Sequence, residues 1–178
     1  MLRRHRPLSM MLVLIVTLLG VMIAADVRAT PVSLLARQAT PGTAPAVSAE
    51  VFAHGTPAAA TDQELSLARV TIPPGATIPA HEHPGLQLAS ILSGTLSYTV
   101  LTGEVTLNRA ATGGTPGPVE RITAGQTAAI RPGDWVAETP GNIHMAQNAG
   151  AEPVVILISR LFTAGAPASI PAPATPVP

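Results

Sequence analysis

The sequence predicts an all-β domain of short antiparallel strands. Apolar or alternating runs recur about every eight to twelve residues between turns that contain Gly or Pro. No stretch keeps a sustained apolar period of 3.6 residues, so long amphipathic helices are not expected. The chain has 19 prolines and 15 glycines among 178 residues, a composition that favours strands and turns. A β-sandwich or a β-barrel is consistent with all three observations.

Turn signals divide the domain into strands. Pro73-Pro74-Gly75 stops an alternating run, and Ser93-Gly94 joins two apolar runs as a two-residue hairpin signal. Residues 110–118 are a loop by composition, and the turns Pro132-Gly133-Asp134 and Pro140-Gly141-Asn142 bracket one short strand. The predicted strands, in chain order, cover residues 65–70, 86–92, 95–102, 105–107, 119–123, 127–130, 135–138, 143–147 and 153–161.

Residues 1–29 have the pattern of an export segment. The basic stretch 3–6 precedes the apolar run 8–25, and Val27-Arg28-Ala29 ends in a small-residue cleavage pattern. The segment is therefore a signal peptide or, because the run is about 18 residues long, an uncleaved N-terminal membrane anchor. Both alternatives predict an extracytoplasmic protein, secreted or membrane-anchored, with membrane contact only through this segment if it is uncleaved.

Two further segments are predicted to lie outside the folded domain. Residues 30–49 form a Pro/Ala/Thr-rich linker, and residues 163–178 form a Pro/Ala-rich disordered tail because prolines remove backbone donors. The domain itself is predicted to span residues 50–162. A segment of that length buries roughly two thirds of its surface and supports one core.

Composition excludes several classes of function. The chain has no cysteine, which rules out disulfides, thiolate nucleophiles, zinc ribbons and iron–sulfur clusters. Without residues 1–29, six arginines face nine acidic residues, and no basic run or set of aromatic side chains is available to bind nucleic acid. Any metal ligand must therefore be a histidine, a carboxylate or an amide.

Three histidines form the candidate site. His81 and His83 are two residues apart, so on a strand both imidazoles lie on one face. Gln87 follows the turn Pro84-Gly85 with the same parity and can offer an amide oxygen, and His144 comes from a separate strand. Three nitrogens and one oxygen would suit a divalent metal ion. The alternative is that the first two histidines are polar residues on an exposed strand face.

Two stretches carry a family resemblance. Residues 75–94, GATIPAHEHPGLQLASILSG, and residues 133–148, GDWVAETPGNIHMAQN, resemble the paired motifs of the cupin family, in order. The resemblance implies a small single-domain cupin, a single antiparallel β-barrel of jelly-roll type. It also implies a metal held by two histidines and an acid from the first motif and one histidine from the second. Cupins of this kind commonly pair through outer strands, so a homodimer is expected.

The sequence departs from these motifs at two positions. Thr139 replaces a proline, but Pro140 follows it, so the turn should survive. Gln87 stands at the acidic ligand position, and a neutral amide would leave a divalent ion at formal charge +2. Such a site should be a stronger Lewis acid, favour an anionic substrate and bind its metal more weakly. An empty site is the alternative, and Zn, Mn, Fe and Ni are not distinguished.

Two further residues are candidate catalytic groups. Tyr98 has the parity of an interior side chain, so its hydroxyl could reach a ligand or act as an acid; otherwise it fills the core and bonds to a backbone group. Glu138 occupies a place where cupins usually carry an apolar residue. It is either a pocket carboxylate available for proton transfer or a rim charge in solvent.

The function predicted from these residues is that of an exported cupin that binds one divalent metal ion. It would act on, or hold, a small polar or anionic molecule, and the Gln87 site favours isomerase or lyase chemistry by a Lewis acid. A non-catalytic binding module and a metal-dependent dioxygenase are the alternatives, so whether the chain is an enzyme stays open.

Overall fold

The computed structural model describes residues 46–172, which form strands and turns. The export segment 1–29, residues 30–45 of the predicted linker and residues 173–178 of the predicted tail lie outside the described residues. In the described range, no helix has the length and apolar character that a membrane crossing needs.

The strands of the described range cover most of the domain. They are β1 Ser48–Gly55, β2 Gln63–Ile72, β3 Thr77–Glu82, β4 Leu86–Ser93, β5 Leu96–Thr102, β6 Glu104–Asn108, β7 Val119–Thr123, β8 Thr127–Ile130, β9 Trp135–Glu138, β10 Ile143–Gln147, β11 Val154–Thr163 and β12 Ile170–Pro171.

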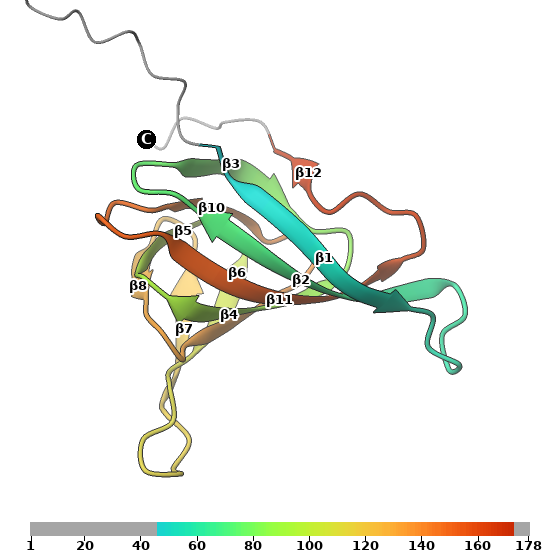
Figure 1. Cartoon of the computed structure of the whole chain (residues 1–178), viewed down its shortest axis with the longest axis horizontal. Coiled ribbons are helices and arrows are strands. Elements are labelled where there is room, and N and C mark those ends of the chain that lie inside the picture. The colour runs from blue at the N-terminus through green and yellow to red at the C-terminus, as the bar shows by residue number, and fades with distance from the viewer. Residues whose placement is uncertain (1–45, 173–178) are drawn as a thin grey trace, which may run out of the picture. The chain divides into compact units, whose positions relative to one another are not determined.

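Two antiparallel sheets make up the fold. One has the order β1-β2-β11-β4-β9-β6-β7, and the other has the order β12-β3-β10-β5-β8. Figure 1 shows the long strands β1, β2 and β11 running side by side in the first sheet. Strand pairing among residues 46–172 does not close the two sheets into one barrel, so the domain is a jelly-roll sandwich. The predicted all-β, antiparallel fold of jelly-roll type is confirmed.

The core lies between the two sheets. Alternate residues of each inner strand are buried, as in β11, where Val154, Ile156 and Ile158 are at most 5% exposed. This is the period of two that a strand imposes on its side chains. Ile72, Val100, Val105, Leu107 and Ile130 are fully buried. The alternation read from the sequence therefore marks the core-facing positions.

The turn at Ser93-Gly94 does not form the predicted hairpin. It falls between β4 and β5, but β4 pairs with β11 and β9, whereas β5 pairs with β10 and β8. The turn therefore carries the chain from one sheet to the other. Gly94 has φ +75°, and an added Cβ would come within 2.9 Å of Val154, so the crossover needs glycine here.

The ordered domain is longer at both ends than the predicted range 50–162. Strand β1 begins at Ser48, and β12 lies within the segment predicted as a disordered tail, where Ile170 pairs with Glu82 and Pro171 with His81. Strand β12 is the edge of its sheet, a position that tolerates the missing donor of a proline. Proline content alone therefore did not distinguish a tail from an edge strand.

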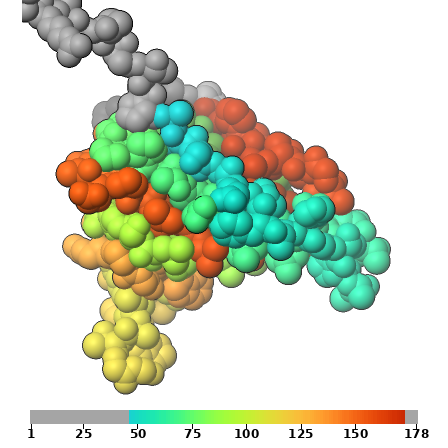
Figure 2. Space-filling view, in the orientation of Figure 1, coloured from blue at the N-terminus to red at the C-terminus, as the bar shows by residue number. Residues whose placement is uncertain are grey.

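Residues 109–118 form the long connection between β6 and β7. Figures 1 and 2 show it, in yellow, projecting away from the body of the domain. At its base Arg109 donates to Glu120 and Asp134 at 2.8 Å each. The loop predicted from composition thus lies away from the core.

Candidate metal centre

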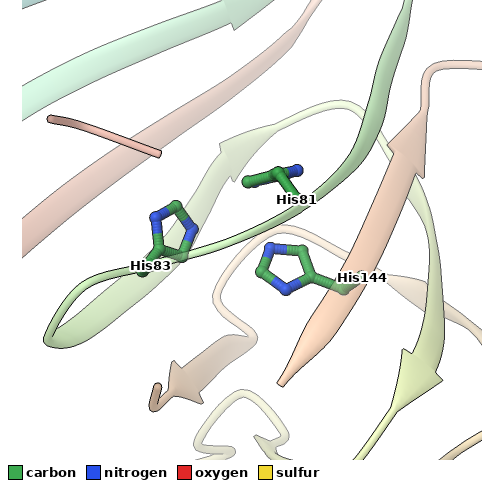
Figure 3. A group of neighbouring side chains, drawn as sticks. All are labelled: His81, His83 and His144. Atoms are coloured by element: carbon green, nitrogen blue, oxygen red, sulfur yellow. The ribbon is translucent and has the colours of Figure 1, made fainter. Parts of the chain in front are cut away.

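Neighbouring strands of the five-stranded sheet bring the three histidines together. His81 on β3 lies directly opposite His144 on β10, and His83 follows the end of β3. The centroid of the His81 ring is 4.3 Å from that of the His144 ring and 5.0 Å from that of the His83 ring. One ligand nitrogen from each residue lies within 4.8 Å of the other two. Figure 3 shows the rings gathered about a common point.

A close-packed turn sets the position of His83 and of the strand after it. An added Cβ at Gly85 would overlap the carbonyl oxygen of Leu161 and the side chain of Phe162 on β11. Only glycine lets the backbone approach β11 this closely. The chain passes here from the five-stranded to the seven-stranded sheet, which brings Gln87 on β4 beside the histidines.

Backbone carbonyls fix the orientation of all three imidazoles. The Nδ1 atoms of His81, His83 and His144 lie 2.8, 2.9 and 3.1 Å from the carbonyl oxygens of Pro79, Ala168 and Asn142. A carbonyl oxygen can only accept, so each Nδ1 carries the proton and each Nε2 presents a lone pair. This outer hydrogen bond is what commonly orients a metal-binding histidine.

The protonation state of the cluster suits a metal ion. Burial, together with the nearby His144, lowers the pKa of His81 to about 4, and burial also lowers the pKa of His144. Neutral imidazoles are the form that binds a divalent cation. The three residues therefore fit a divalent metal through nitrogen.

Gln87 lies in the site, but its amide is turned away from the predicted role. Its Oε1 accepts a 2.8 Å hydrogen bond from Nε of Arg160. Its Nε2 lies 2.9 Å from Nε2 of His83 and donates to Oε2 of Glu138 at 2.6 Å. The structure thus directs the amide nitrogen, not the oxygen, toward the histidines.

Glu138 is a buried carboxylate at the centre of the site. Its side chain is 3% exposed. The sequence left open whether Glu138 is a pocket carboxylate or a rim charge in solvent, and the structure places it in the interior. One oxygen lies 3.3 Å from Nε2 of His83 and the other 3.3 Å from Nε2 of His144. Burial alone would raise the pKa of Glu138, but hydrogen bonds to its oxygens, that of the Tyr98 hydroxyl among them, hold the pKa below its usual range.

Tyr98 also faces the interior. It is 2% exposed, its ring stacks on His144 at 5.0 Å, and its hydroxyl donates to Glu138. The partner of the hydroxyl is therefore a site carboxylate, and residues 46–172 offer it no backbone partner of the kind considered from the sequence.

The site lines a cavity of about 340 Å³ between the two sheets. Its wall is mostly apolar, and its polar members include His81, His83, His144, Glu138, Tyr98 and Arg160. A hollow of about 510 Å³ near His54 at the β1 and β2 end is larger. It lacks a comparable convergence of titratable groups, so the interior cavity is the candidate functional site.

Arg160 is the site residue that the sequence analysis missed. Its guanidinium donates to Gln87, and burial lowers its pKa, an effect that the charge of Glu138 opposes. Arg160 has the same parity on β11 as the buried Ile156 and Ile158. A cation on the core-facing parity of a buried strand is the sequence signal that could have found it.

Comparison with known proteins gives a family match. Residues 45–176 match the family model described as Cupin. No curated protein sequence matches the chain.

Solved structures similar to this chain include three from bacteria. A cupin superfamily protein from Desulfitobacterium hafniense is 15% identical, with TM-score 0.44 and coverage of 69% of this chain and 84% of its own. The DMSP lyase of Ruegeria pomeroyi is 19% identical, with TM-score 0.43 and coverage of 71% and 51%. The oxalate decarboxylase of Bacillus subtilis, which has Mn(II) centres, is 24% identical, with TM-score 0.38 and coverage of 60% and 23%. The chain therefore spans about half of the lyase and a quarter of the decarboxylase.

Proposed function

The chain belongs to the cupin family, and on that premise we propose that it binds one divalent metal ion and, beside it, a small anionic molecule. The observation that carries the proposal is the shared orientation of His81, His83 and His144. In each ring Nδ1 is hydrogen-bonded to a carbonyl, which leaves the lone pair on Nε2, and one nitrogen of each ring lies within 4.8 Å of the other two.

Arg160 supports the anionic class of ligand. Its Nε is engaged by Gln87, whereas its two terminal nitrogens have no hydrogen-bond partner among residues 46–172. Arg160 lines the cavity that contains the histidines. A half-buried guanidinium with free donors suits a carboxylate, and the apolar wall suits a short carbon chain attached to it.

A divalent ion in this site would supply Lewis-acid polarisation of a carbonyl or carboxylate, the chemistry of isomerases and lyases. The chain's own residues would orient the ligand and exclude water. Arg160 would hold the anionic group, and the sheets on either side would close the cavity to solvent.

A non-catalytic binding module is the second candidate, and one observation favours it. The two candidate proton-transfer groups, Tyr98 and Glu138, are hydrogen-bonded to one another. The Tyr98 hydroxyl gives its one proton to this bond, so it cannot donate to a ligand while the bond is intact.

We also propose that the protein acts outside the cytoplasm and is a homodimer. The basic and apolar pattern of residues 1–29 supports export. Mass spectrometry of the chain from its native host would find either a mature N-terminus near residue 30 or an intact anchor.

Metal analysis of the full chain, purified without an affinity tag, tests the central proposal. We expect about one equivalent in the wild type and in Glu152→Gln, a control that removes an exposed carboxylate. His81→Ala and His144→Ala should lose most of it. Equal and negligible metal in all four proteins would overturn the proposal.

Titration of the metal-loaded chain with small carboxylates, neutral sugars and phenols then tests the ligand class. Carboxylates should bind, and Arg160→Met should lose that binding while retaining metal. Saturable binding without product identifies the module, product identifies the enzyme, and iron-dependent dioxygen uptake would identify the dioxygenase instead.

A further inference from the structure

We propose that the acidic metal ligand of this chain is Glu138 on β9, and that Gln87 on β4 positions this carboxylate instead of binding the ion. The inference rests on the proposed metal site and concerns which residue completes it. The carboxylate that is missing at position 87 in the first motif, residues 75–94, is then supplied by Glu138 in the second motif, residues 133–148.

Sheet register places the two side chains at one point. Gln87 on β4 lies directly opposite Glu138 on β9 and, on its other side, directly opposite Arg160 on β11. Side chains that are directly opposite in a sheet share a face, with Cβ atoms about 5 Å apart. Arg160, Gln87 and Glu138 therefore form a row across three neighbouring strands. An acidic residue on β9 can thus reach the same site as an acidic residue at position 87 on β4.

The hydrogen bonds of Gln87 fix which end of its amide faces the histidines. Arg160 has only donors, so the atom that it contacts at 2.8 Å is the amide oxygen. The amide nitrogen must then face Glu138, to which it donates at 2.6 Å, and His83. Rotating the amide would place donor against donor at Arg160. Gln87 can offer oxygen to a metal only by breaking this row, whereas Glu138 already presents oxygen.

Distances around Glu138 match those between ligands of one ion. Its oxygens lie 3.3 Å from Nε2 of His83 and from Nε2 of His144. Two ligands that are each about 2.1 Å from an ion, and about 100° apart, are separated by about 3.2 Å. The carboxylate is therefore at ligand separation from two of the three imidazoles.

Electrostatics favour the same assignment. A carboxylate that is 3% exposed needs a positive partner, and the guanidinium in the same row, that of Arg160, is hydrogen-bonded to Gln87. Three neutral imidazoles and one carboxylate leave a divalent ion at formal charge +1. The stronger Lewis acidity expected from a neutral amide at position 87 therefore does not apply, because Glu138 supplies the charge.

Titration of the metal-free full chain with Co²⁺, followed by visible absorption, tests the assignment. Glu138→Gln should weaken Co²⁺ binding about tenfold or more and change the absorption band, because an anionic ligand is lost. The exchange Gln87→Glu with Glu138→Gln should restore affinity, because it returns a carboxylate to the row. Gln87→Met should weaken binding less than Glu138→Gln, and Glu152→Gln should leave it unchanged.

The outcomes separate this inference from the proposed function. Co²⁺ binding that is equal in the wild type and in folded Glu138→Gln overturns the inference and leaves the histidine site standing. A larger loss in Gln87→Met than in Glu138→Gln also overturns it and makes Gln87 the ligand. No binding by the wild type overturns both proposals. Circular dichroism confirms that each variant is folded.

Discussion

The hydroxyl of Tyr98 on β5 donates a 2.8 Å hydrogen bond to Oε1 of Glu138 on β9 and so links the two sheets through the interior. Burial, together with the negative charge of Glu138, raises the pKa of Tyr98 far above its usual range. The phenol therefore stays protonated at neutral pH. Its role in this structure is that of a donor to the site carboxylate.

Tyr98→Phe should therefore change stability more than metal content. The substitution leaves a buried carboxylate oxygen without its donor, at a cost of about 1–3 kcal/mol in the free energy of unfolding. Urea unfolding of the metal-free chain measures that cost. Thr99→Val is a matched control that removes an exposed hydroxyl pair with Thr127, and it should cost about 0.5 kcal/mol or less. Unchanged stability with lost turnover would instead make Tyr98 a catalytic acid.

Stability of the metal-free chain should fall as the pH drops from about 6.5 toward 4. The pKa of His81 is lowered to about 4 from the model-compound value of 6.5, chiefly by burial. Between these values the unfolded chain binds more protons than the folded one, so protons favour unfolding. The contribution of neutral His81 to the free energy of unfolding is complete above pH 6.5 and is lost on acidification. The lowered pKa of His144 acts in the same direction.

Urea midpoints at several pH values between 4 and 7 check this dependence. His81→Asn should flatten the slope, because asparagine does not titrate. A midpoint that rises on acidification would contradict the assignment of neutral, buried imidazoles.

Strand positions were predictable from the sequence, but strand partners were not. Alternation and Pro-Gly turns are local signals, and they placed β4 through β11 to within a few residues. The sequence Ser93-Gly94 is equally compatible with a hairpin and with a crossover between sheets. The structure shows a crossover, because β4 pairs with β11 and β9, and Gly94 lies against Val154, far along the chain. That contact is not visible in local sequence.

The histidines were predictable for a similar reason, and the rest of the site was not. Spacing and motif brought His81, His83 and His144 to one place. The amide orientation of Gln87 and the burial of Glu138 depend on the register of β4 with β11 and β9. Register between strands distant in sequence is set by packing, and no single-strand pattern reveals it.

Asn148→Ala should destabilise the fold without touching the metal ligands. Asn148 is fully buried, and its Nδ2 donates to the carbonyl oxygens of Ile72 and Glu152 at 2.8 Å each. Its Oδ1 accepts from the backbone N–H of Gly150. Truncation leaves the buried carbonyl oxygen of Ile72 without this donor and removes two part-buried hydrogen bonds, so we expect a loss of about 3 kcal/mol in the free energy of unfolding.

Asn148→Asp distinguishes the donor role of the Asn148 side-chain amide from its acceptor role. It keeps an acceptor for Gly150 but removes the donor to both carbonyls, so most of the loss should remain. Metal content at low temperature, where both variants are folded, should equal that of the wild type. A variant as stable as the wild type would contradict the bridging role.

Leu88→Glu should convert the proposed homodimer into a monomer. The outer face of the seven-stranded sheet carries exposed apolar side chains from adjoining strands, and Leu67, Leu88 and Trp135 there are 38–39% exposed. A second copy that covers this face would bury these residues, whereas a charge at its centre would have to be desolvated. Light scattering after size-exclusion chromatography measures the mass of the particle in solution.

Val119→Glu is the control. It charges an exposed apolar residue on β7, at the far edge of the sheet, and should not change the mass. A wild-type chain that is monomeric at high concentration would rule out this use of the face.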